Sequence, residues 1–338
     1  MALTDIDAGR LADNVFNNVG PFKNRIINGD MRIDQRNAGA SVTINATAKA
    51  YTVDRWHANG QPTDGVFTVQ QSTTAPTGFT NSLLATVTTA DASIGADQYY
   101  LLCQRIEGYN VADLDFGSAA AKTVTLSFWV RSSLTGTFSG ALENSAENRA
   151  YPFTYSISSA DTWEQKTITI AGDTSGTWLT NNGIGLFVWF DLGCGSNKRG
   201  TAGSWTGSNL YGATGAVQLI ATNGATFYIT GVQLEAGSVA TPFERRSYGQ
   251  ELALCQRYYL EAAAHAQGPV PGAMTTPIYF PVSMRATPTR TNVSAGSSNG
   301  VDSTIITVFD NSSARCQISI TLNGGFVVNR VDAYSAEL

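Results

Sequence analysis

The sequence contains a succession of short segments in which apolar and polar residues alternate, with Gly, Asn, Ser and Thr between them. In the clearest segment, Thr123–Arg131, the residues that share one face are Val124, Leu126, Phe128 and Val130. Comparable segments are Gly65–Gln71, Ser82–Thr88, Gln98–Ile106, Gly136–Leu142, Tyr151–Ile157, Trp163–Ile170, Ile184–Leu192 and Ala225–Leu234. Alternation with a period of two predicts strands with one buried face. We therefore expect an all-β antiparallel β-sandwich, and the chain length and strand count favour a jelly roll.

Three details refine this expectation. Gln98–Ile106 is longer and more apolar than the segments before it, which favours a central position in its sheet. Pro152 cannot donate a hydrogen bond, so it places the strand Tyr151–Ile157 at an edge or a bulge. Glu107–Leu114 lacks alternation, and we expect a short helix or a turn there.

The segment Gln250–Ala264 has helical periodicity, with Leu252, Cys255 and Tyr259 on one side. This stripe predicts either the interface of a homotrimer or packing onto the chain's own sandwich. Beyond the helix, four strands are expected at Ile278–Val282, Thr304–Phe309, Cys316–Leu322 and Phe326–Tyr334, with a hairpin turn at Asn323–Gly325. Because such a small β unit has a thin core, it would gain stability from oligomerisation.

The composition disfavours several classes of protein. Charged residues make up 14% of the chain and its net charge is −5, which argues against nucleic acid as a partner. Cys103, Cys194, Cys255 and Cys316 are widely spaced and form no metal-binding motif, so we expect free thiols in a protein made in a reducing cytosol. Neither a signal peptide nor an apolar run of about 20 residues is visible, so we expect no export signal and no membrane insertion.

Signals of catalysis are weak. His57 and His265 have no neighbouring Ser or Cys motif, and the sequence contains no nucleophile elbow, phosphate-binding loop or HExxH motif. Glu143 and Asp191 are candidates for the carboxylate pair of a glycosidase, but we expect them to be solvated surface carboxylates. The expected protein is therefore not an enzyme.

Aromatic residues in Gly-rich loops are the best candidates for a binding site. Trp178, Trp205 and Tyr211 lie in such loops, the last two within the long segment Gly193–Ala216. Because large exposed aromatic side chains are hard to explain by internal packing, we expect these three to contact a glycan or a partner chain. Trp129 and Trp189 lie on strands, where they belong either to the core or to the floor of a groove.

Two stretches near the ends of the expected sandwich carry a family resemblance. The first comprises Asn24–Met31 and Tyr51–Trp56, and the second is Gly231–Arg246. With these segments the chain resembles bacteriophage and prophage tail-fibre or neck-fibre proteins. The resemblance implies a carbohydrate-binding-module-like jelly roll, a location in the virion and a homotrimer. It carries over no catalytic motif.

On this basis we expect three regions. Residues 1–23 would anchor the protein to neck, portal-adaptor or tail proteins of the virion, residues 24–247 would form the jelly roll, and residues 248–338 would form a helical connector and a small β domain. The expected role is adhesion to a polysaccharide on the host surface. A structural head-decoration or collar protein and a polysaccharide-degrading tail spike are the alternatives.

Sandwich modules of this kind often hold a structural calcium ion. Asp30, Asp54 and Glu235 are oxygen-bearing candidates near the boundaries of the sandwich. Because calcium takes 6–8 oxygen ligands and no compact loop supplies them, we expect these residues to serve turns and ion pairs instead. No cofactor is expected.

Overall fold

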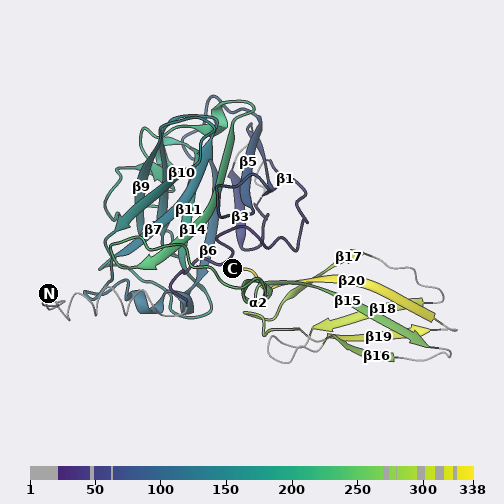
Figure 1. Ribbon diagram of the computed structural model, residues 1–338. Coiled ribbons are helices and arrows are strands. Elements are labelled where there is room, and N and C mark those ends of the chain that lie inside the picture. Colours follow the sequence, from purple (N-terminus) through teal and green to yellow (C-terminus); the bar gives the residue numbers. More distant parts are fainter. Residues whose placement is uncertain are drawn as a thin grey trace, which may run out of the picture. The chain divides into compact units, whose positions relative to one another are not determined.

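The computed structural model describes residues 22–45, 49–61, 64–268, 274–278, 280–294, 301–308, 316–322 and 326–338 (Figure 1). The chain forms two compact units, Met1–Arg245 and Arg246–Leu338. The predicted fold class is confirmed, because the first unit is an antiparallel β-sandwich and the second contains a short helix followed by further strands. The proposed anchoring segment lies outside the described residues up to position 21 and stays a prediction.

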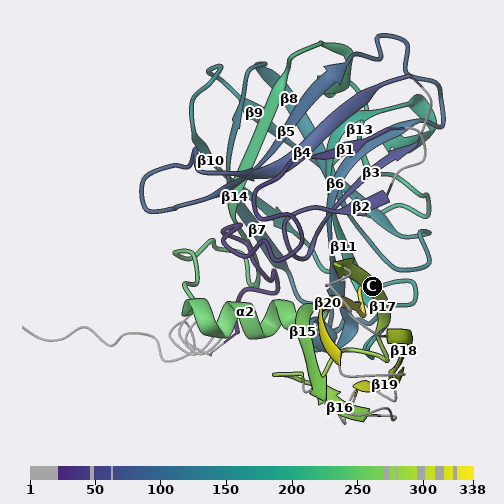
Figure 2. The ribbon, with the colours of Figure 1, turned by 90° about the vertical axis from the view of Figure 1, so that its right-hand side faces the viewer.

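The first unit is built from two six-stranded sheets, sheet A and sheet B (Figure 1 and Figure 2). Sheet A has the order β1 (Val42–Ile44), β4 (Val66–Ser72), β5 (Ser82–Thr89), β14 (Thr226–Ala236), β7 (Val124–Ser132) and β10 (Glu164–Ile170). Sheet B has the order β2 (Lys49–Tyr51), β3 (Trp56–Gln61), β6 (Tyr99–Glu107), β11 (Ile184–Cys194), β8 (Gly136–Glu143) and β9 (Ala150–Ile157). All neighbouring strands within these two sheets are antiparallel.

The strand order explains two details of the sequence. The apolar strand β6 lies between β3 and β11, in the interior of sheet B, as its composition predicts. Strand β9, which contains Pro152, is the last strand of the same sheet. Neighbouring strands are mostly distant in sequence, so the chain crosses repeatedly between the two sheets, which is the jelly-roll pattern.

Apolar side chains from both sheets fill the space between them. Val124, Leu126, Phe128 and Val130 of β7 are fully buried, as their alternation predicts. The ring of Phe128 meets that of Phe190 on β11 edge to face, with ring centroids 5.2 Å apart. Each such side chain stabilises the fold by about 1.5–3 kcal/mol when it is fully buried.

The segment that leads into the sandwich is fixed to its last strand, β14. The side chain of Asn24 donates a hydrogen bond to the carbonyl oxygen of Val232 and accepts one from the backbone N–H of Leu234, both at 3.0 Å. The N–H of Val232 in turn donates to the carbonyl oxygen of Gly29 at 2.9 Å. A Cβ atom at Gly29 would lie 2.2 Å from the Val232 oxygen, so only glycine allows this approach.

An irregularity in β14 makes these backbone groups available. The register with β7 shifts between Thr230 and Gln233, which is a β-bulge. Gly231, inside the bulge, has a φ of 60°, a conformation that favours glycine. The two stretches that carry the family resemblance are therefore joined in space by hydrogen bonds.

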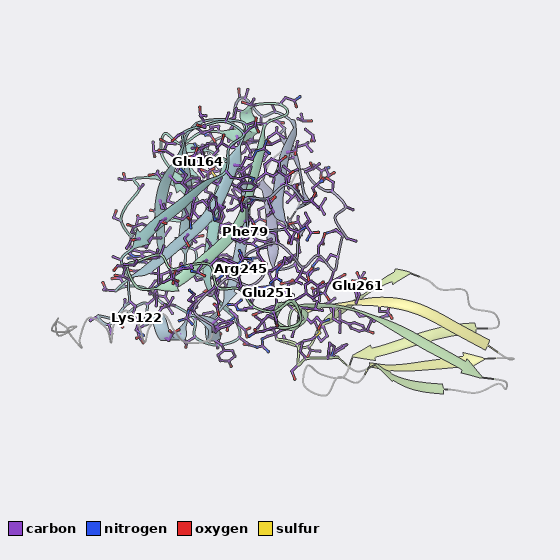
Figure 3. All side chains as sticks on the ribbon, in the orientation of Figure 1. Phe79, Lys122, Glu164, Arg245, Glu251 and Glu261 are labelled. Atoms are coloured by element: carbon purple, nitrogen blue, oxygen red, sulfur yellow. The ribbon has the colours of Figure 1, made fainter. Side chains whose placement is uncertain are left out.

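The chain that follows β14 folds back onto the same junction. The carboxylate of Glu244 accepts hydrogen bonds from the backbone N–H groups of Phe22 and Asn24, at 3.0 and 2.6 Å. The ring of Phe243 meets that of Phe79 at 5.3 Å, and the guanidinium of Arg245 lies 4.8 Å from the Phe79 ring centroid (Figure 3).

Short helical turns and bridges complete the first unit. Gly108–Asn110 and Ala112–Leu114 are 3₁₀ helices, in agreement with the short helix or turn predicted at Glu107–Leu114. The long segment after β11 contains a 3₁₀ helix at Ser196–Lys198 and the parallel pair β12 (Arg199–Gly200) and β13 (Gly212–Ala213). A last 3₁₀ turn spans Leu219–Ala221.

The second unit begins with helix α2 (Tyr248–Gln256), whose first turn is capped by the Ser247 hydroxyl accepting from the N–H of Gln250. Strands β15 (Tyr259–Gly268), β20 (Phe326–Ser335) and β17 (Thr289–Ser294) form one sheet. Strands β16 (Met274–Ile278), β19 (Cys316–Leu322) and β18 (Val301–Val308) form another.

The extent of the predicted helix, Gln250–Ala264, is wrong. The helix ends at Gln256, and the Ala-rich segment that follows is strand β15, which pairs with β20 from Tyr259 to Gly268. The helix propensity of alanine is outweighed here by a complete ladder of backbone hydrogen bonds. Tyr259 therefore lies on a strand and not on a helical stripe with Leu252 and Cys255.

Other local predictions also differ from the structure. The strand predicted at Ile278–Val282 lies earlier in the chain, at Met274–Ile278, and β1, β2, β3, β15 and β17 were not predicted as strands. The hairpin turn predicted at Asn323–Gly325 falls outside the described residues, and its flanking strands, β19 and β20, belong to different sheets, so a two-strand hairpin is wrong.

We predict that Asn24→Ala lowers the free energy of unfolding by about 3 kcal/mol, because it leaves the buried carbonyl of Val232 and the N–H of Leu234 without side-chain partners. Urea unfolding of the whole chain measures this loss. The control is Asn197→Ala, because Asn197 is an exposed asparagine whose side chain bonds to the exposed carboxylate of Asp97. Its effect should stay within about 0.5 kcal/mol. Equal effects of the two substitutions would contradict the role of Asn24.

Candidate functional site

Four aromatic rings from separate segments meet on the first unit and form what we call the tryptophan cluster: Phe116, Tyr151, Trp178 and Trp205. Trp178 and Trp205 lie 5.4 Å apart at nearly right angles. Phe116 contacts both, at 5.0 and 5.8 Å, and Tyr151 contacts Trp205 at 5.3 Å. All four side chains are half-buried. The structure thus brings together two of the three aromatic residues predicted to form a binding site.

Hydrogen bonds from the two indoles fix their orientation. The Nε1–H of Trp178 donates to the carbonyl oxygen of Ser175 at 3.1 Å, and that of Trp205 donates to the carbonyl oxygen of Ala171 at 2.7 Å. Each indole N–H thus has a backbone partner within the protein, and the ring faces carry the apolar part of each partly exposed side chain. Such surface can stack on the C–H faces of a ligand.

The loops that carry the tryptophans are tied to strand β9 and to its neighbours. Thr206, next to Trp205, forms a reciprocal backbone bridge with Ala150 at 2.9 and 3.1 Å. The guanidinium of Arg149 makes two hydrogen bonds to the carboxylate of Asp173, at 2.6 and 2.7 Å, and so holds the loop that leads to Trp178. These contacts fix the two loops that carry the tryptophans to the sandwich.

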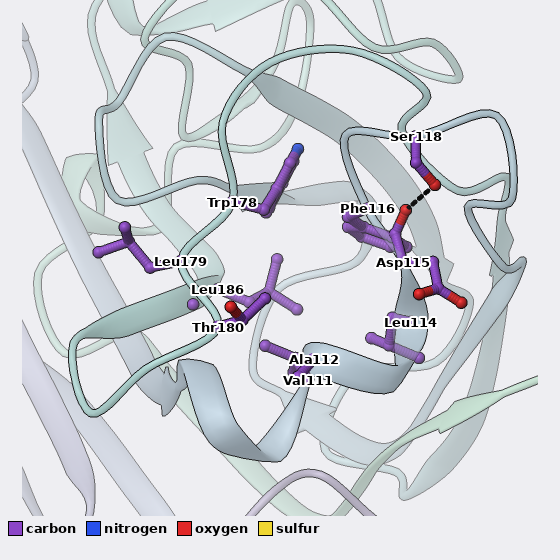
Figure 4. A pocket seen from close by; sticks show the side chains of 11 residues that line it. Val111, Ala112, Leu114, Asp115, Phe116, Ser118, Trp178, Leu179, Thr180 and Leu186 are labelled. Carbon is purple, nitrogen blue, oxygen red and sulfur yellow. Dashed lines mark hydrogen bonds between the residues drawn. The ribbon is translucent and has the colours of Figure 1, made fainter.

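A pocket of about 190 Å³ opens beside Trp178 (Figure 4). Trp178 and Phe116 lie on one side of it, and Val111 and Ala112 lie on the opposite side. Leu114, Leu179 and Leu186 complete its apolar surface, while its polar groups come from Asp115, Ser118 and Thr180. A predominantly apolar concave pocket with a few polar groups is the usual form of a small-ligand site.

A second, more open pocket of about 240 Å³ adjoins Tyr151 of the cluster. It is lined by Tyr151, Phe153, Thr154, Ile168, Ala202 and Gly203. Since Tyr151 contacts Trp205, which contacts Trp178, the two pockets are linked by one continuous set of ring contacts.

Tyr211, the third predicted residue, lies elsewhere. It is buried on the outer face of sheet B, where its ring meets those of Tyr99 at 4.9 Å and Trp189 at 5.0 Å. Burial raises its pKa above the usual range of a tyrosine. The segment around Tyr211 covers this face of the sheet, so its role in the single chain is packing.

A buried ion pair holds the long segment after β11 in place. Arg199 donates to the carboxylate of Asp191 on β11 at 2.7 and 2.8 Å, and it also donates to the carbonyl oxygens of Ala216 and Val217. Ser139 of β8 donates to the same carboxylate at 2.8 Å. Asp191 is therefore not a solvated carboxylate, and the prediction that it is one is wrong.

Glu143 is also buried, in contrast to the prediction. Its Oε2 accepts a hydrogen bond from the indole of Trp189 at 2.8 Å, and its Oε1 has no hydrogen-bond partner within the described part of the chain. Burial raises the pKa of Glu143 to about 9, and the hydrogen bond from Trp189 opposes this shift only in part. Glu143 is thus a neutral carboxylic acid at pH 7.

Glu143 and Asp191 do not form a glycosidase pair. Glu143 is paired with Phe187 in the ladder, and Asp191 is paired with Ser139, so they lie four residues apart along their strands. Four residues correspond to about 13 Å. The carboxylates of glycosidases are about 5–9.5 Å apart.

The three calcium candidates are each engaged by protein groups. Asp30 pairs with Arg32, Asp54 accepts from Gln35, and Glu235 accepts from Gln233 and Thr241. Across the described ranges there is no group of three or more His, Cys, Asp or Glu side chains that could hold a metal ion.

The proposed oligomer interface is partly hidden in the single chain. Cys255 and Tyr259 are buried, whereas Leu252 is half-buried. The homotrimer stays a prediction. Within the described residues, no helix is long and apolar enough to cross a membrane.

No known family model matches the sequence, and no curated protein matches it. Among solved structures, the chain is similar to the enzymatically active domain of tailspike protein 4 from bacteriophage CBA120, at 13% identity and a TM-score of 0.35 over 64% of this chain and 22% of that chain. It is also similar to the family 11 carbohydrate-binding module of a cellulosomal cellulase of Clostridium thermocellum, at 12% identity and a TM-score of 0.29 over 59% of this chain and 96% of that chain. The function must therefore be argued from this chain's own residues.

The raised pKa of Glu143 predicts a pH-dependent stability. Between pH 4.5, the ordinary pKa, and about 9, the folded state keeps a proton that the unfolded state has lost. The free energy of unfolding therefore falls as the pH rises through this window, by up to about 1.36 kcal/mol per pH unit. Glu143→Gln keeps an oxygen that accepts the hydrogen bond from Trp189, but it cannot ionise. The dependence of the free energy of unfolding on pH should therefore lose the contribution of one proton, about 1.36 kcal/mol per pH unit.

Urea unfolding at pH 5, 7 and 9 measures this slope. The control is Asp97→Asn, because Asp97 is an exposed carboxylate that is not among the charges acting on Glu143. It should retain the slope of the unmodified chain. A Glu143→Gln protein with an unchanged slope would show that Glu143 is ionised in the folded state.

We also predict that Arg199→Met lowers the free energy of unfolding by about 3–5 kcal/mol, because the Asp191 carboxylate stays buried without its partner. Limited proteolysis should then cut between Gly193 and Ala216 sooner. Arg131→Met, at a partly exposed pair with Asp161, should cost at most about 1 kcal/mol. If both substitutions have the same small effect, Arg199 does not hold the segment.

Proposed function

We propose that this protein binds glycans through the tryptophan cluster and does so without catalysing a reaction. The observation that carries the proposal is the arrangement of Trp178 and Trp205, whose N–H groups are satisfied internally while their rings stay partly exposed beside an apolar pocket. Sugars combine C–H faces, which stack on aromatic rings, with hydroxyl groups, which need hydrogen-bond partners. Asp115 and Thr180 supply oxygen atoms for such bonds at the pocket.

The two pockets favour a polymer over a single sugar as the ligand. They are linked by the contacting rings of Trp178, Trp205 and Tyr151. A chain of sugars could therefore contact several rings in succession. Sequential stacking of this kind adds affinity without requiring deep burial of any one unit.

We further propose that the protein is a tail or neck fibre of a phage virion and that its ligand is a polysaccharide on the host surface. The support is the family resemblance of Asn24–Met31 and Gly231–Arg246, together with the hydrogen bonds that join these two stretches. In this proposal residues 1–23 attach to the particle and the protein acts as a homotrimer. A head-decoration or collar protein would need no glycan site, and a tail spike would need a carboxylate pair at closer range than Glu143 and Asp191.

We predict that Trp178→Ala and Trp205→Ala each weaken binding to host cells, and to polysaccharide purified from their surface, by about ten-fold or more, which is 1.4 kcal/mol. The matched control is Trp163→Ala. Trp163 is also half-buried, but it contacts Tyr228 and lies outside the cluster. This variant should bind as the unmodified chain does.

Each alternative predicts a different result in the same assays. No adhesion of the unmodified protein to host cells or polysaccharide would favour a decoration protein. Release of reducing sugar from the polysaccharide would reveal a tail spike. Full binding by both Trp178→Ala and Trp205→Ala would exclude the tryptophan cluster as the site.

A further inference from the structure

The pocket beside Trp178 is polar on one part of its surface and aliphatic on the rest. Its accessible apolar floor is formed by Ala112 and Leu179, which are half-buried, and by the small exposed part of Val111, while Leu114 and Leu186 in the lining are fully buried (Figure 4). The polar groups come from other lining positions, and one of them is already used, because the Ser118 hydroxyl donates to the carbonyl oxygen of Asp115 at 2.7 Å.

This division limits which face of a sugar can enter. An ordinary hexose carries a hydroxyl group on nearly every carbon, and a hydroxyl placed against Val111 and Leu179 would lose its water without gaining a partner. A methyl group would instead replace water at an apolar surface. The floor therefore favours a sugar that presents a methyl group.

The charge of the pocket lining favours a neutral ligand. Asp115 is the charged residue among those that line the pocket, and no cationic side chain belongs to the lining. An anionic sugar such as a uronic acid would therefore meet a carboxylate of the same charge and no cationic partner in the lining.

We propose that the pocket selects a neutral sugar that carries a methyl group, with that group against the floor of Val111, Ala112 and Leu179 and the ring beside Trp178. The 6-deoxyhexoses and the N-acetylhexosamines share this chemistry. The inference rests on the proposed glycan binding and adds the class of sugar that is recognised.

The test uses matched pairs of free sugars that differ only at the relevant group, titrated into the full chain. The pairs are D-fucose with D-galactose, L-rhamnose with L-mannose, and N-acetylglucosamine with glucose. The indole N–H signals of the tryptophans, followed by NMR, report binding at the cluster. We expect one methyl-bearing sugar to bind roughly ten- to a hundred-fold more tightly than its partner.

Val111→Thr keeps the shape of the floor but adds a hydroxyl group, so it should reduce this preference to within a few-fold. The control is Val239→Thr, at an exposed valine outside the pocket lining. It should leave the preference unchanged. If Val111→Thr does not fold, Leu179→Asn tests the same floor from a half-buried position.

The outcomes separate the inference from the function on which it rests. A preference in the first two pairs identifies a 6-deoxyhexose, and a preference in the third identifies an N-acetylhexosamine. Equal binding within every pair would overturn the inference while leaving glycan binding intact. Failure of every sugar and of the host polysaccharide to perturb the tryptophan signals would overturn both.

Discussion

The buried ion pair between Arg199 and Asp191 determines how the long segment after β11 is ordered. The segment is rich in Gly, Ser and Thr and has few apolar side chains with which to hold itself against the sandwich. Arg199 donates hydrogen bonds to Asp191 on the sheet and to the carbonyl oxygens of Ala216 and Val217 at the far end of the segment. It therefore connects that end of the segment to the sheet. A charge of this kind is tolerated in the interior only because nearly every donor has an acceptor. The positions of Trp205 and Tyr211 both depend on this anchor.

The same segment shows how one loop can serve two purposes. At Tyr211 it covers the outer face of sheet B and buries the rings of Tyr99 and Trp189. At Trp205 it extends past the edge strand β9, where the rings stay partly exposed. Packing at one end thus supplies the rigidity that a binding surface needs at the other end.

Much of the sandwich could be predicted from the sequence, because alternation of apolar residues is a local signal and the core of β7 follows it directly. The short strands β1 and β2 gave no such signal, since three residues are too few to show a period. Strand β15 was missed because its alanines favour a helix locally, whereas its pairing with β20 depends on residues far along the chain.

The site was predicted in part. Gly-rich loops pointed to Trp178 and Trp205, but nothing local distinguished them from Tyr211, whose burial depends on which face its loop covers. Phe116 and Val111 were missed because they follow or occupy short 3₁₀ turns, and only the fold brings them to Trp178.

The position of β14 has a consequence for how the protein is made. This strand is the last of the sandwich to be synthesised, yet it lies in the middle of sheet A, between β5 and β7. Until the ribosome has released Ala236, both neighbours present unpaired edges, which invite pairing with other chains. The sandwich can therefore close only at a late stage of translation, through contacts that are distant in sequence and slow to form. During that interval the exposed strand edges make the nascent chain prone to aggregation.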